Sequence, residues 1–148
     1  MQLRPARPDD AMAVARVHVR SWQAGYRGLL PDAFLETMRP EERAARYTFG
    51  DPDPAQPKTI LAVDANKILG FATVSPARDN DEVRLGELCA LYVDPDHWRR
   101  GIGAALMTAA DARLRDMGFD AAMLWVLKHN ARAERFYRKN GWNADGAE

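Results

Sequence analysis

The amino-acid sequence predicts an α/β fold in which a mixed central sheet is flanked by helices. Three observations support this class. β-Prone runs follow one another closely between positions 59 and 93, as in an antiparallel meander. A strand, an amphipathic helix and another strand then fill positions 83–127, which is typical of a crossover between parallel strands. Helical segments precede and follow these strands, so the predicted order is β-α-α-β-β-β-α-β-α.

The N-terminal third predicts one short strand followed by helices. Leu3–Ala6 can form the strand, and Asp9 or Asp10 can cap the next helix. The apolar face of that helix carries Val14, Val17 and Trp22. Ser21–Pro31 is rich in aromatic and glycine residues, so we expect a bend there. The remaining pieces are helices at Pro31–Met38 and Pro40–Tyr47 and a breaker-rich loop at Asp51–Pro57.

The middle of the chain predicts three strands. Thr59–Val63 and Ile68–Val74 are joined across Asp64–Lys67, which is typical of a hairpin. Val83–Val93 is a longer strand, and the Asp94-Pro95 pair that follows stops it because proline cannot donate to a ladder.

The last third predicts a crossover helix, a strand and a final helix. The first helix spans Gly101–Met117, and its inward face carries Ile102, Leu106, Ala110, Leu114 and Met117. A strand at Ala122–Leu127 and a helix at Asn130–Asn140 follow, and Gly141 ends that helix. We expect Ala133, Phe136 and Tyr137 to face inward.

Composition and charge limit the class of protein. The chain has 148 residues, and we expect residues 1–148 to form a single domain. Its formal net charge of +0 provides no global field that would attract nucleic acid or an anionic membrane. The N-terminus lacks the apolar run of a signal peptide, and no later stretch suits a membrane span. The lone cysteine, Cys89, excludes an internal disulfide, so we expect a soluble cytoplasmic protein.

The most informative stretch runs from Leu91 to Leu106. A strand ends, a short loop turns, and a helix begins with glycines at positions 101 and 103. Glycine lets main-chain N–H groups approach an anion, and the first N–H groups of a helix are unpaired at the positive end of its dipole. Arg99 and Arg100 add positive charge, so Arg99–Ala104 predicts a pyrophosphate site. No Gly-Lys-Ser/Thr sequence is present, which excludes a P-loop, and Leu106 replaces the third glycine of a dinucleotide fingerprint.

This stretch resembles the central Gln/Arg-x-x-Gly-x-Gly/Ala motif of the GNAT N-acetyltransferase superfamily, whose glycines Gly101 and Gly103 match. Trp98 stands where the family usually has Gln or Arg. The residue that positions the loop is therefore open, and Arg99 or Arg100 could substitute. Downstream, Asn130–Trp142 resembles the family's Asn-x-x-Ala-x-x-Phe-Tyr-x-x-x-Gly-Phe/Trp segment.

The resemblance implies an acetyl-CoA-dependent N-acetyltransferase that moves an acetyl group directly to a primary amine within a ternary complex. By position, Leu91 and Val93 would offer main-chain N–H and C=O groups to the acetyl carbonyl and the pantetheine arm. The expected residues that bind acetyl-CoA are Leu91, Val93, Arg99, Arg100, Gly101, Gly103, Ala104 and Asn130. Asn130 could equally cap its helix. No metal is expected, because the histidines at 18, 97 and 129 lack metal-ligand spacing and a cysteine partner.

Amine acetylation needs a base for the attacking amine, and the resemblance points to Glu87. Glu87 precedes Gly101 by the spacing at which some family members carry a catalytic glutamate. It would act directly or through water. Glu87 could instead face solvent or pair with Arg84, and many relatives use a water chain.

The departing thiolate benefits from an acid, for which the resemblance points to Tyr137. A phenol with an ordinary pKa of about 10 is protonated at neutral pH. Tyr137 could also be a core residue.

The acceptor amine belongs to a small molecule or peptide, and we expect Trp22 and Tyr26 to bind it. Tyr47 and Phe49 could join them, and Asp32 or Glu36 could attract an ammonium group. The aromatic residues could equally form core. The sequence does not discriminate an aminoglycoside, a polyamine, an amino acid or a protein N-terminus.

Two further expectations concern the end of the chain and the activity. Family members usually add a strand after the segment that begins at Gly141, and the sequence shows no such strand. It could be truncated, disordered or supplied by a partner, and an open sheet edge would favour a homodimer. The alternative function is a non-catalytic acyl-CoA-binding or regulatory module on the same fold. A nucleotide-binding protein that uses the glycine loop for ATP is a third hypothesis.

Overall fold

The computed structural model describes residues 1–76, 85–119, 121–123 and 131–139. Its centre is a sheet with the strand order β1-β2-β3-β4-β5. The strands are β1 (Gln2–Pro5), β2 (Lys58–Asp64), β3 (Lys67–Pro76), β4 (Leu85–Val93) and β5 (Ala121–Met123). Neighbours from β1 to β4 are antiparallel, whereas β4 and β5 are parallel. The predicted mixed sheet is confirmed.

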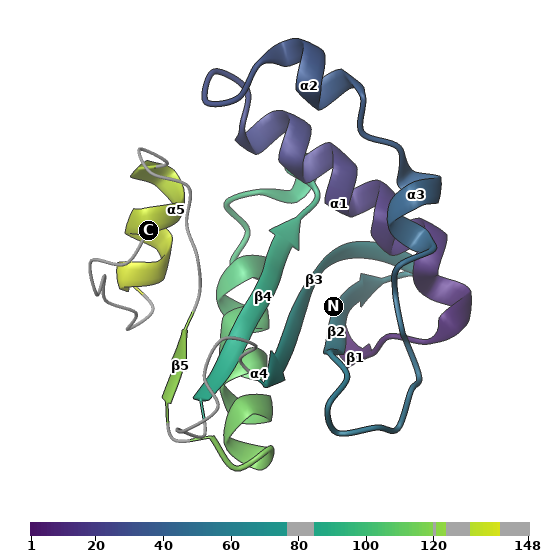
Figure 1. Cartoon of the computed structure of the whole chain (residues 1–148). Coiled ribbons are helices and arrows are strands. Elements are labelled where there is room, and N and C mark those ends of the chain that lie inside the picture. The colour runs from purple at the N-terminus through teal and green to yellow at the C-terminus, as the bar shows by residue number, and fades with distance from the viewer. Residues whose placement is uncertain (77–84, 120, 124–130, 140–148) are drawn as a thin grey trace.

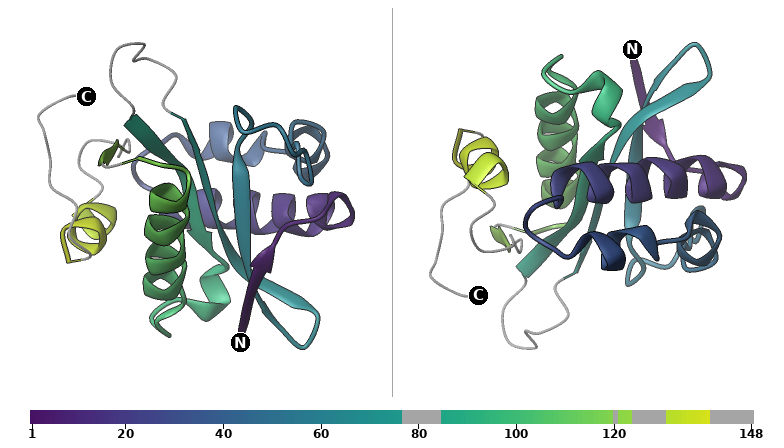
Figure 2. Two further views of the ribbon diagram at one scale, coloured as in Figure 1. Left: turned by 90° about the horizontal axis from the view of Figure 1, so that it is seen from below. Right: turned by 90° about the horizontal axis from the view of Figure 1, so that it is seen from above.

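Helices cover both faces of this sheet (Figures 1 and 2). On one face lie α1 (Ala11–Gly25), α2 (Asp32–Glu36) and α3 (Pro40–Ala44), and on the other lies α4 (Ile102–Asp116). The helix α5 (Ala131–Lys139) lies beyond the β5 edge. The structure has three helices between the first two strands, and the separate segments predicted at Pro31–Met38 and Pro40–Tyr47 correspond to α2 and α3, although the predicted order counted only two helices there. Short 3₁₀ turns occupy Pro8–Asp10 and Pro95–His97.

The helix α1 continues through the start of the segment predicted to bend. It ends at Gly25, and the turn comes at Gly28, whose φ is +88°. Tertiary contacts sustain the extra turn, because the Ser21 hydroxyl donates to the Val93 carbonyl and the Trp22 indole N–H donates to the Tyr92 hydroxyl. The bend expected within Ser21–Pro31 therefore lies in the second half of that segment, after α1 ends.

The hairpin between β2 and β3 has the predicted turn. Asp64 pairs with Lys67, and the two residues between them have positive φ, 49° at Ala65 and 69° at Asn66. Two left-handed residues form the turn that matches the twist of antiparallel strands.

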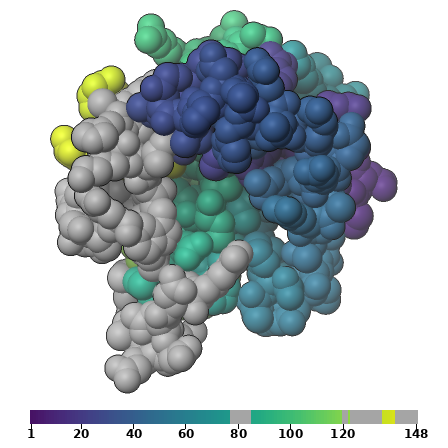
Figure 3. Space-filling view, turned by 45° about the horizontal axis from the view of Figure 1, so that its top comes forward, coloured from purple at the N-terminus to yellow at the C-terminus, as the bar shows by residue number. Residues whose placement is uncertain are grey.

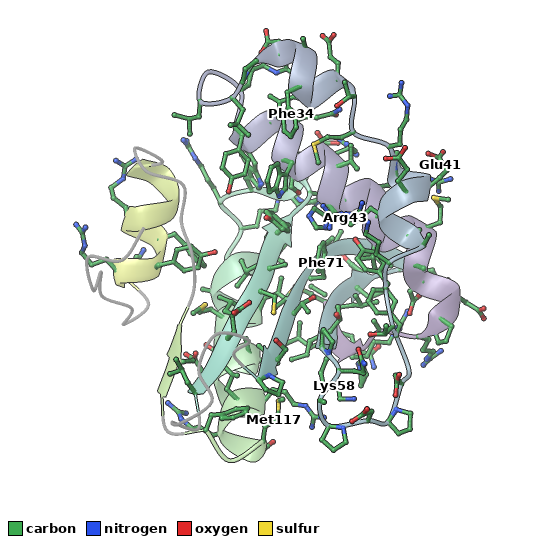
Figure 4. The ribbon with its side chains drawn as sticks, in the orientation of Figure 1. Phe34, Glu41, Arg43, Lys58, Phe71 and Met117 are labelled. Carbon is green, nitrogen blue, oxygen red and sulfur yellow. The ribbon has the colours of Figure 1, made fainter. Side chains whose placement is uncertain are left out.

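The core has one apolar cluster on each face of the sheet. The α4 cluster includes Leu106, Ala110 and Leu114, which confirms the inward face predicted for this helix. The α1 cluster includes Val14, Val17 and Phe71. Burying a large apolar side chain stabilises a fold by about 1.5–3 kcal/mol, so these clusters hold the helices on the sheet. In Figure 4, Phe71 of β3 lies beneath α1, on the same face as Arg43 of α3.

Some predictions fall outside the described residues. The strand predicted at Ala122–Leu127 is described as Ala121–Met123, and the helix predicted at Asn130–Asn140 as Ala131–Lys139. The expected absence of a final strand concerns residues after Gly141, which also lie outside. Among the described residues, no helix is both long and apolar enough to cross a membrane.

Candidate active site

The candidate site lies at the carboxyl end of β4, where the chain passes through a loop into α4 (Figure 1). The described pairs between β4 and β5 run from Leu85–Ala121 to Glu87–Met123, whereas β3 accompanies β4 up to Val93. In Figure 3, the teal-green atoms of the β4 region lie recessed beside the blue atoms of the helical segments before β2. Part of the β4 region thus lies at the bottom of a recess in this view.

A β-bulge interrupts β4 ahead of this end. Thr73 pairs with Ala90, but Val74 pairs with Leu88, so Cys89 is the extra residue on β4. The bulge shifts the alternation of side chains, because Leu88 and Leu91 both pack on the α4 face while Ala90 and Tyr92 pack on the α1 face.

The main-chain groups of Leu91 and Val93 face away from β3. The Asp94 N–H donates to the Leu69 carbonyl at 2.7 Å, and hydrogen-bonded positions alternate along an antiparallel ladder. The main-chain N–H and C=O of Tyr92 therefore point toward β3, and those of Leu91 and Val93 point to the opposite edge of β4. This is the orientation that the predicted contacts to the acetyl carbonyl and pantetheine arm require.

The Val93 carbonyl oxygen already accepts two side-chain hydrogen bonds. The Ser21 hydroxyl donates at 2.9 Å, and the Trp98 indole N–H donates at 2.8 Å. Both lone pairs are used, so the N–H of Val93, rather than its C=O, is the group left to contact a ligand.

The loop after β4 leads into α4, whose first turn has no side-chain cap. Gly101 is the N-cap of α4, with φ of +79° and no side-chain capping bond, and a Cβ added there would meet nothing within 4 Å. Arg99 also has a positive φ, 65°, and both Arg99 and Arg100 are exposed. Ala104 is exposed in the first turn of the helix. The first N–H groups of α4 are thus available for an anion, as predicted.

Gly103 serves a different purpose from Gly101. A Cβ at this position would lie 3.1 Å and 3.2 Å from two carbons of the Phe136 ring. The glycine therefore allows the ring from α5 to pack closely on α4, and it does not border open space.

Glu87 lies on the α1 face of β4, half-buried and between Ser75 of β3 and Met123 of β5. The assignment follows from its neighbours, because Leu88 packs in the α4 cluster and a Cβ at Gly86 would collide with Leu114 of α4. Arg84, its predicted alternative partner, lies outside the described residues. The carboxylate shares the face of β4 that α1 covers further along.

Tyr137 lies on α5, half-buried, and packs against the α4 cluster. Its ring centroid is 5.3 Å from that of Phe136. It also acts on Tyr92, whose pKa is raised mainly by burial and further by the nearby Tyr26 and Tyr137. Three phenols from α1, β4 and α5 therefore gather at the end of β4.

The predicted acceptor residues Trp22 and Tyr26 belong to this aromatic group. Their ring centroids are 4.6 Å apart, and Trp22 is hydrogen-bonded to Tyr92. Tyr92 is a site residue that the sequence reasoning missed. Its position between Leu91 and Val93, pointing to the opposite face of the strand, was the available signal.

His18 lies on the buried face of α1, where it meets Tyr47. The His18 Nδ1 and the Tyr47 hydroxyl are 3.1 Å apart, and the Tyr47 ring stacks on Phe49 at 4.6 Å. Burial, with a smaller contribution from Arg43, lowers the pKa of His18 to about 3. Tyr47 and Phe49 pack against the α1 cluster, which is the core alternative considered for them.

The remaining candidates lie on the surface or outside the described residues. Asp32 pairs with Arg27 at 3.2 Å on the surface, and Glu36 is exposed. Asn130 and His129 lie outside the described residues. In the part of the chain that is described, no group of three or more metal-binding side chains is found.

Comparisons with known proteins agree on one family. The model of the acetyltransferase (GNAT) family matches residues 18–142. The uncharacterized N-acetyltransferase YuaI of Bacillus subtilis (strain 168) is 30% identical over 130 residues, which are 86% of this chain and 72% of that protein. A mycothiol acetyltransferase of Salinispora tropica is 39% identical over 90 residues, but these are 57% of this chain and only 29% of that protein.

Solved structures show the same fold. The PaiA N-acetyltransferase of Thermoplasma acidophilum, solved in complex with coenzyme A, superposes with a TM-score of 0.80 at 20% identity. The match covers 99% of this chain and 92% of that one.

Proposed function

This chain is an acetyltransferase of the GNAT family, and we propose that it moves the acetyl group of acetyl-CoA directly to a primary amine of a small molecule or peptide within a ternary complex. The observation that carries the proposal is the end of β4. There the outward main-chain groups of Leu91 and Val93 adjoin the uncapped start of α4 at Gly101. We also propose that the described residues form one domain, since a single sheet connects them.

The donor site fits the chemistry of coenzyme A. The first N–H groups of α4 and the exposed guanidinium groups of Arg99 and Arg100 would bind the pyrophosphate. Leu91 and the Val93 N–H would bind the acetyl carbonyl and the pantetheine arm. Asn130 is kept as a binding residue from the resemblance alone. Acetyl-CoA supplies the thioester, whose thiolate leaves as the amide bond forms.

Glu87 and Tyr137 would carry the two proton transfers. The attacking amine loses a proton, which Glu87 would accept directly or through water. The thiolate of CoA gains a proton, which the Tyr137 hydroxyl would donate. This division is supported by the placement of Glu87 on the α1 face and of Tyr137 beside the aromatic group.

The aromatic group of Trp22, Tyr26 and Tyr92 would receive the acceptor. Aromatic faces attract an ammonium group by cation–π interaction, worth about 0.5–2 kcal/mol. The neighbouring rings of Trp22 and Tyr26 offer such faces next to the end of β4.

The test combines binding with turnover. Free CoA release from acetyl-CoA is measured against a panel of an aminoglycoside, a polyamine, amino acids and peptides, and CoA binding is measured by calorimetry. We expect CoA to bind and at least one amine to stimulate release. Binding without release across the panel would favour the non-catalytic acyl-CoA module. Stabilisation by ATP and not by CoA would indicate the nucleotide-binding alternative.

A further inference from the structure

We propose that Trp98 is the positioning residue of the loop that holds the CoA pyrophosphate, an inference that rests on the proposed function. The family usually has Gln or Arg at this position, so the side chain in this chain needs its own explanation. Here the indole N–H of Trp98 holds the loop by donating a hydrogen bond to the last carbonyl of β4.

The Trp98 hydrogen bond closes the loop onto the strand from which it leaves. Its Nε1–H donates to the Val93 oxygen at 2.8 Å, across five positions of the chain. The ring is half-buried, and the Trp98 backbone is extended, with φ −62° and ψ 153°. The bond therefore fixes the direction in which the chain enters Arg99.

The first residue of the loop is fixed as well. Asp94 is buried, and its N–H donates to the Leu69 carbonyl at 2.7 Å. Its carboxylate accepts from the Asp96 N–H at 3.0 Å and from Arg20 of α1 at 2.9 Å. The segment from Asp94 to Trp98 is thus held at both ends, on the sheet and on α1.

The strained part of the loop begins directly after Trp98. Arg99 adopts φ of 65° and Gly101 φ of 79°. A non-glycine residue in the left-handed region is strained and keeps that conformation only when its surroundings hold it. Trp98 is the hydrogen-bonded residue directly before this strained part. Its bond therefore helps to fix the orientation of the N–H groups at the start of α4.

The arginines after Trp98 do not hold the loop on β4. Arg99 and Arg100 are exposed, and the Arg100 guanidinium lies 3.2 Å from the Nδ1 of His97. Within the described residues, neither arginine side chain bonds to the main chain of β4. Their exposed side chains could face a phosphate, whereas Trp98 bonds the loop to β4.

The experiment separates the indole N–H from the indole ring. Trp98→Phe keeps a ring but removes the donor, and Trp98→Gln restores a donor of the type that the family carries. CoA affinity is measured by calorimetry for the full chain of each variant. Trp98→Phe should fold, because Ser21 still donates to the Val93 oxygen, and denaturant unfolding checks this. We expect its Kd for CoA to rise about 3- to 10-fold, the range of one neutral hydrogen bond, with Trp98→Gln closer to wild type.

Kinetics give a second readout. In Trp98→Phe, the KM for acetyl-CoA should rise while kcat at saturation stays near wild type. With S-acetylpantetheine, which lacks the pyrophosphate, kcat/KM should be the same for both proteins.

The outcomes distinguish this inference from the proposed function. If the wild-type chain does not bind CoA, the proposed function fails. If the wild type binds CoA but Trp98→Phe binds it equally well, the positioning role of Trp98 fails. Equal losses in Trp98→Phe and Trp98→Gln would also overturn it, because ring packing would then matter and not the N–H.

Discussion

At the residue scale, the proposed proton transfers depend on two side chains from different elements. Glu87 comes from β4 and Tyr137 from α5, and each is half-buried. A half-buried group can exchange protons with water and still be held in one place by its neighbours. Each role can be tested by removing only the group that exchanges the proton.

Replacing the carboxylate tests Glu87. In Glu87→Gln, kcat/KM should fall by about 100-fold or more at neutral pH, because general base catalysis contributes about 10²–10⁴. The Kd for CoA should be unchanged. Steady-state rates from pH 6 to 9 make the measurement, with Glu41→Gln on the exposed surface of α3 as the matched control (Figure 4). Near-normal activity at every pH would remove Glu87 as the base and favour a water chain.

Removing one hydroxyl tests Tyr137. Tyr137→Phe keeps the ring that packs beside Phe136, so the unfolding free energy should change little. We expect kcat to fall about 100-fold while CoA affinity stays within about twofold, because only the proton for the thiolate is lost. A CoA-release assay measures kcat, and calorimetry measures the affinity for CoA. Unchanged turnover would mean that the phenol is only a packing residue.

At the element scale, β4 and α4 together form the proposed donor site. The bulge at Cys89 sets which face each later residue of β4 occupies, and the outward main-chain groups of Leu91 and Val93 follow from the register with β3. The helix α4 then presents its open start next to them. Its two glycines differ, since Gly101 borders open space and Gly103 borders the Phe136 ring.

Adding a methyl group at the start of α4 tests this arrangement. Gly101→Ala should lose about 1–2 kcal/mol of unfolding free energy, because alanine is strained at φ of +79°. It should also weaken CoA binding, because the methyl group occupies the space in front of the helix.

The matched control is Gly28→Ala. Gly28 has φ of +88° and likewise nothing within 4 Å of an added Cβ, but it lies in the turn after α1. It should lose similar stability and keep its affinity for CoA in the absence of acceptor. Equal CoA affinity in the two variants would contradict the assignment of Gly101 to the pyrophosphate site.

At the scale of the whole molecule, one buried histidine couples stability to pH. His18 lies on the buried face of α1, and burial lowers its pKa from 6.5 to about 3 in the folded state. The unfolded chain therefore takes up the proton first as the pH falls. Stability from the neutral His18 is complete above about pH 6.5 and is lost progressively below it.

The unfolding free energy should thus drop by about 2 kcal/mol between pH 7 and pH 5 through this group, at up to about 1.4 kcal/mol per pH unit. Denaturant unfolding at several pH values measures it. In His18→Gln, this slope should disappear even if the variant is less stable at pH 7, because Gln does not titrate. This pH interval lies above the one in which Asp10 loses its contribution to stability. The pKa of Asp10 is lowered, chiefly by its hydrogen bond to Arg4, so its carboxylate is protonated only at lower pH. An unchanged slope in His18→Gln would contradict the assignment.

Local patterns were sufficient to predict most elements. The hairpin at Asp64–Lys67, the apolar face of α4 and the helix start at Gly101 each depend on residues close together in the sequence. Turn chemistry and helical periodicity act over a few positions, so they can be recognised without the fold. The pyrophosphate site is local for the same reason.

The rest of the site depended on contacts between distant positions. Ser21 and Trp22 reach Val93 and Tyr92 across about seventy positions, and these bonds accompany the continuation of α1 into the first residues of the segment Ser21–Pro31. The bulge at Cys89 depends on how β4 pairs with β3, which lies further back in the sequence. By itself, the sequence determined the order of the elements and the acyl donor. Only the tertiary structure decided that Trp98 bonds to Val93 and Trp22 to Tyr92, the contacts on which the proposed roles of Trp98 and Tyr92 rest, because the packing of α1 and of the loop against β4 brings these groups together.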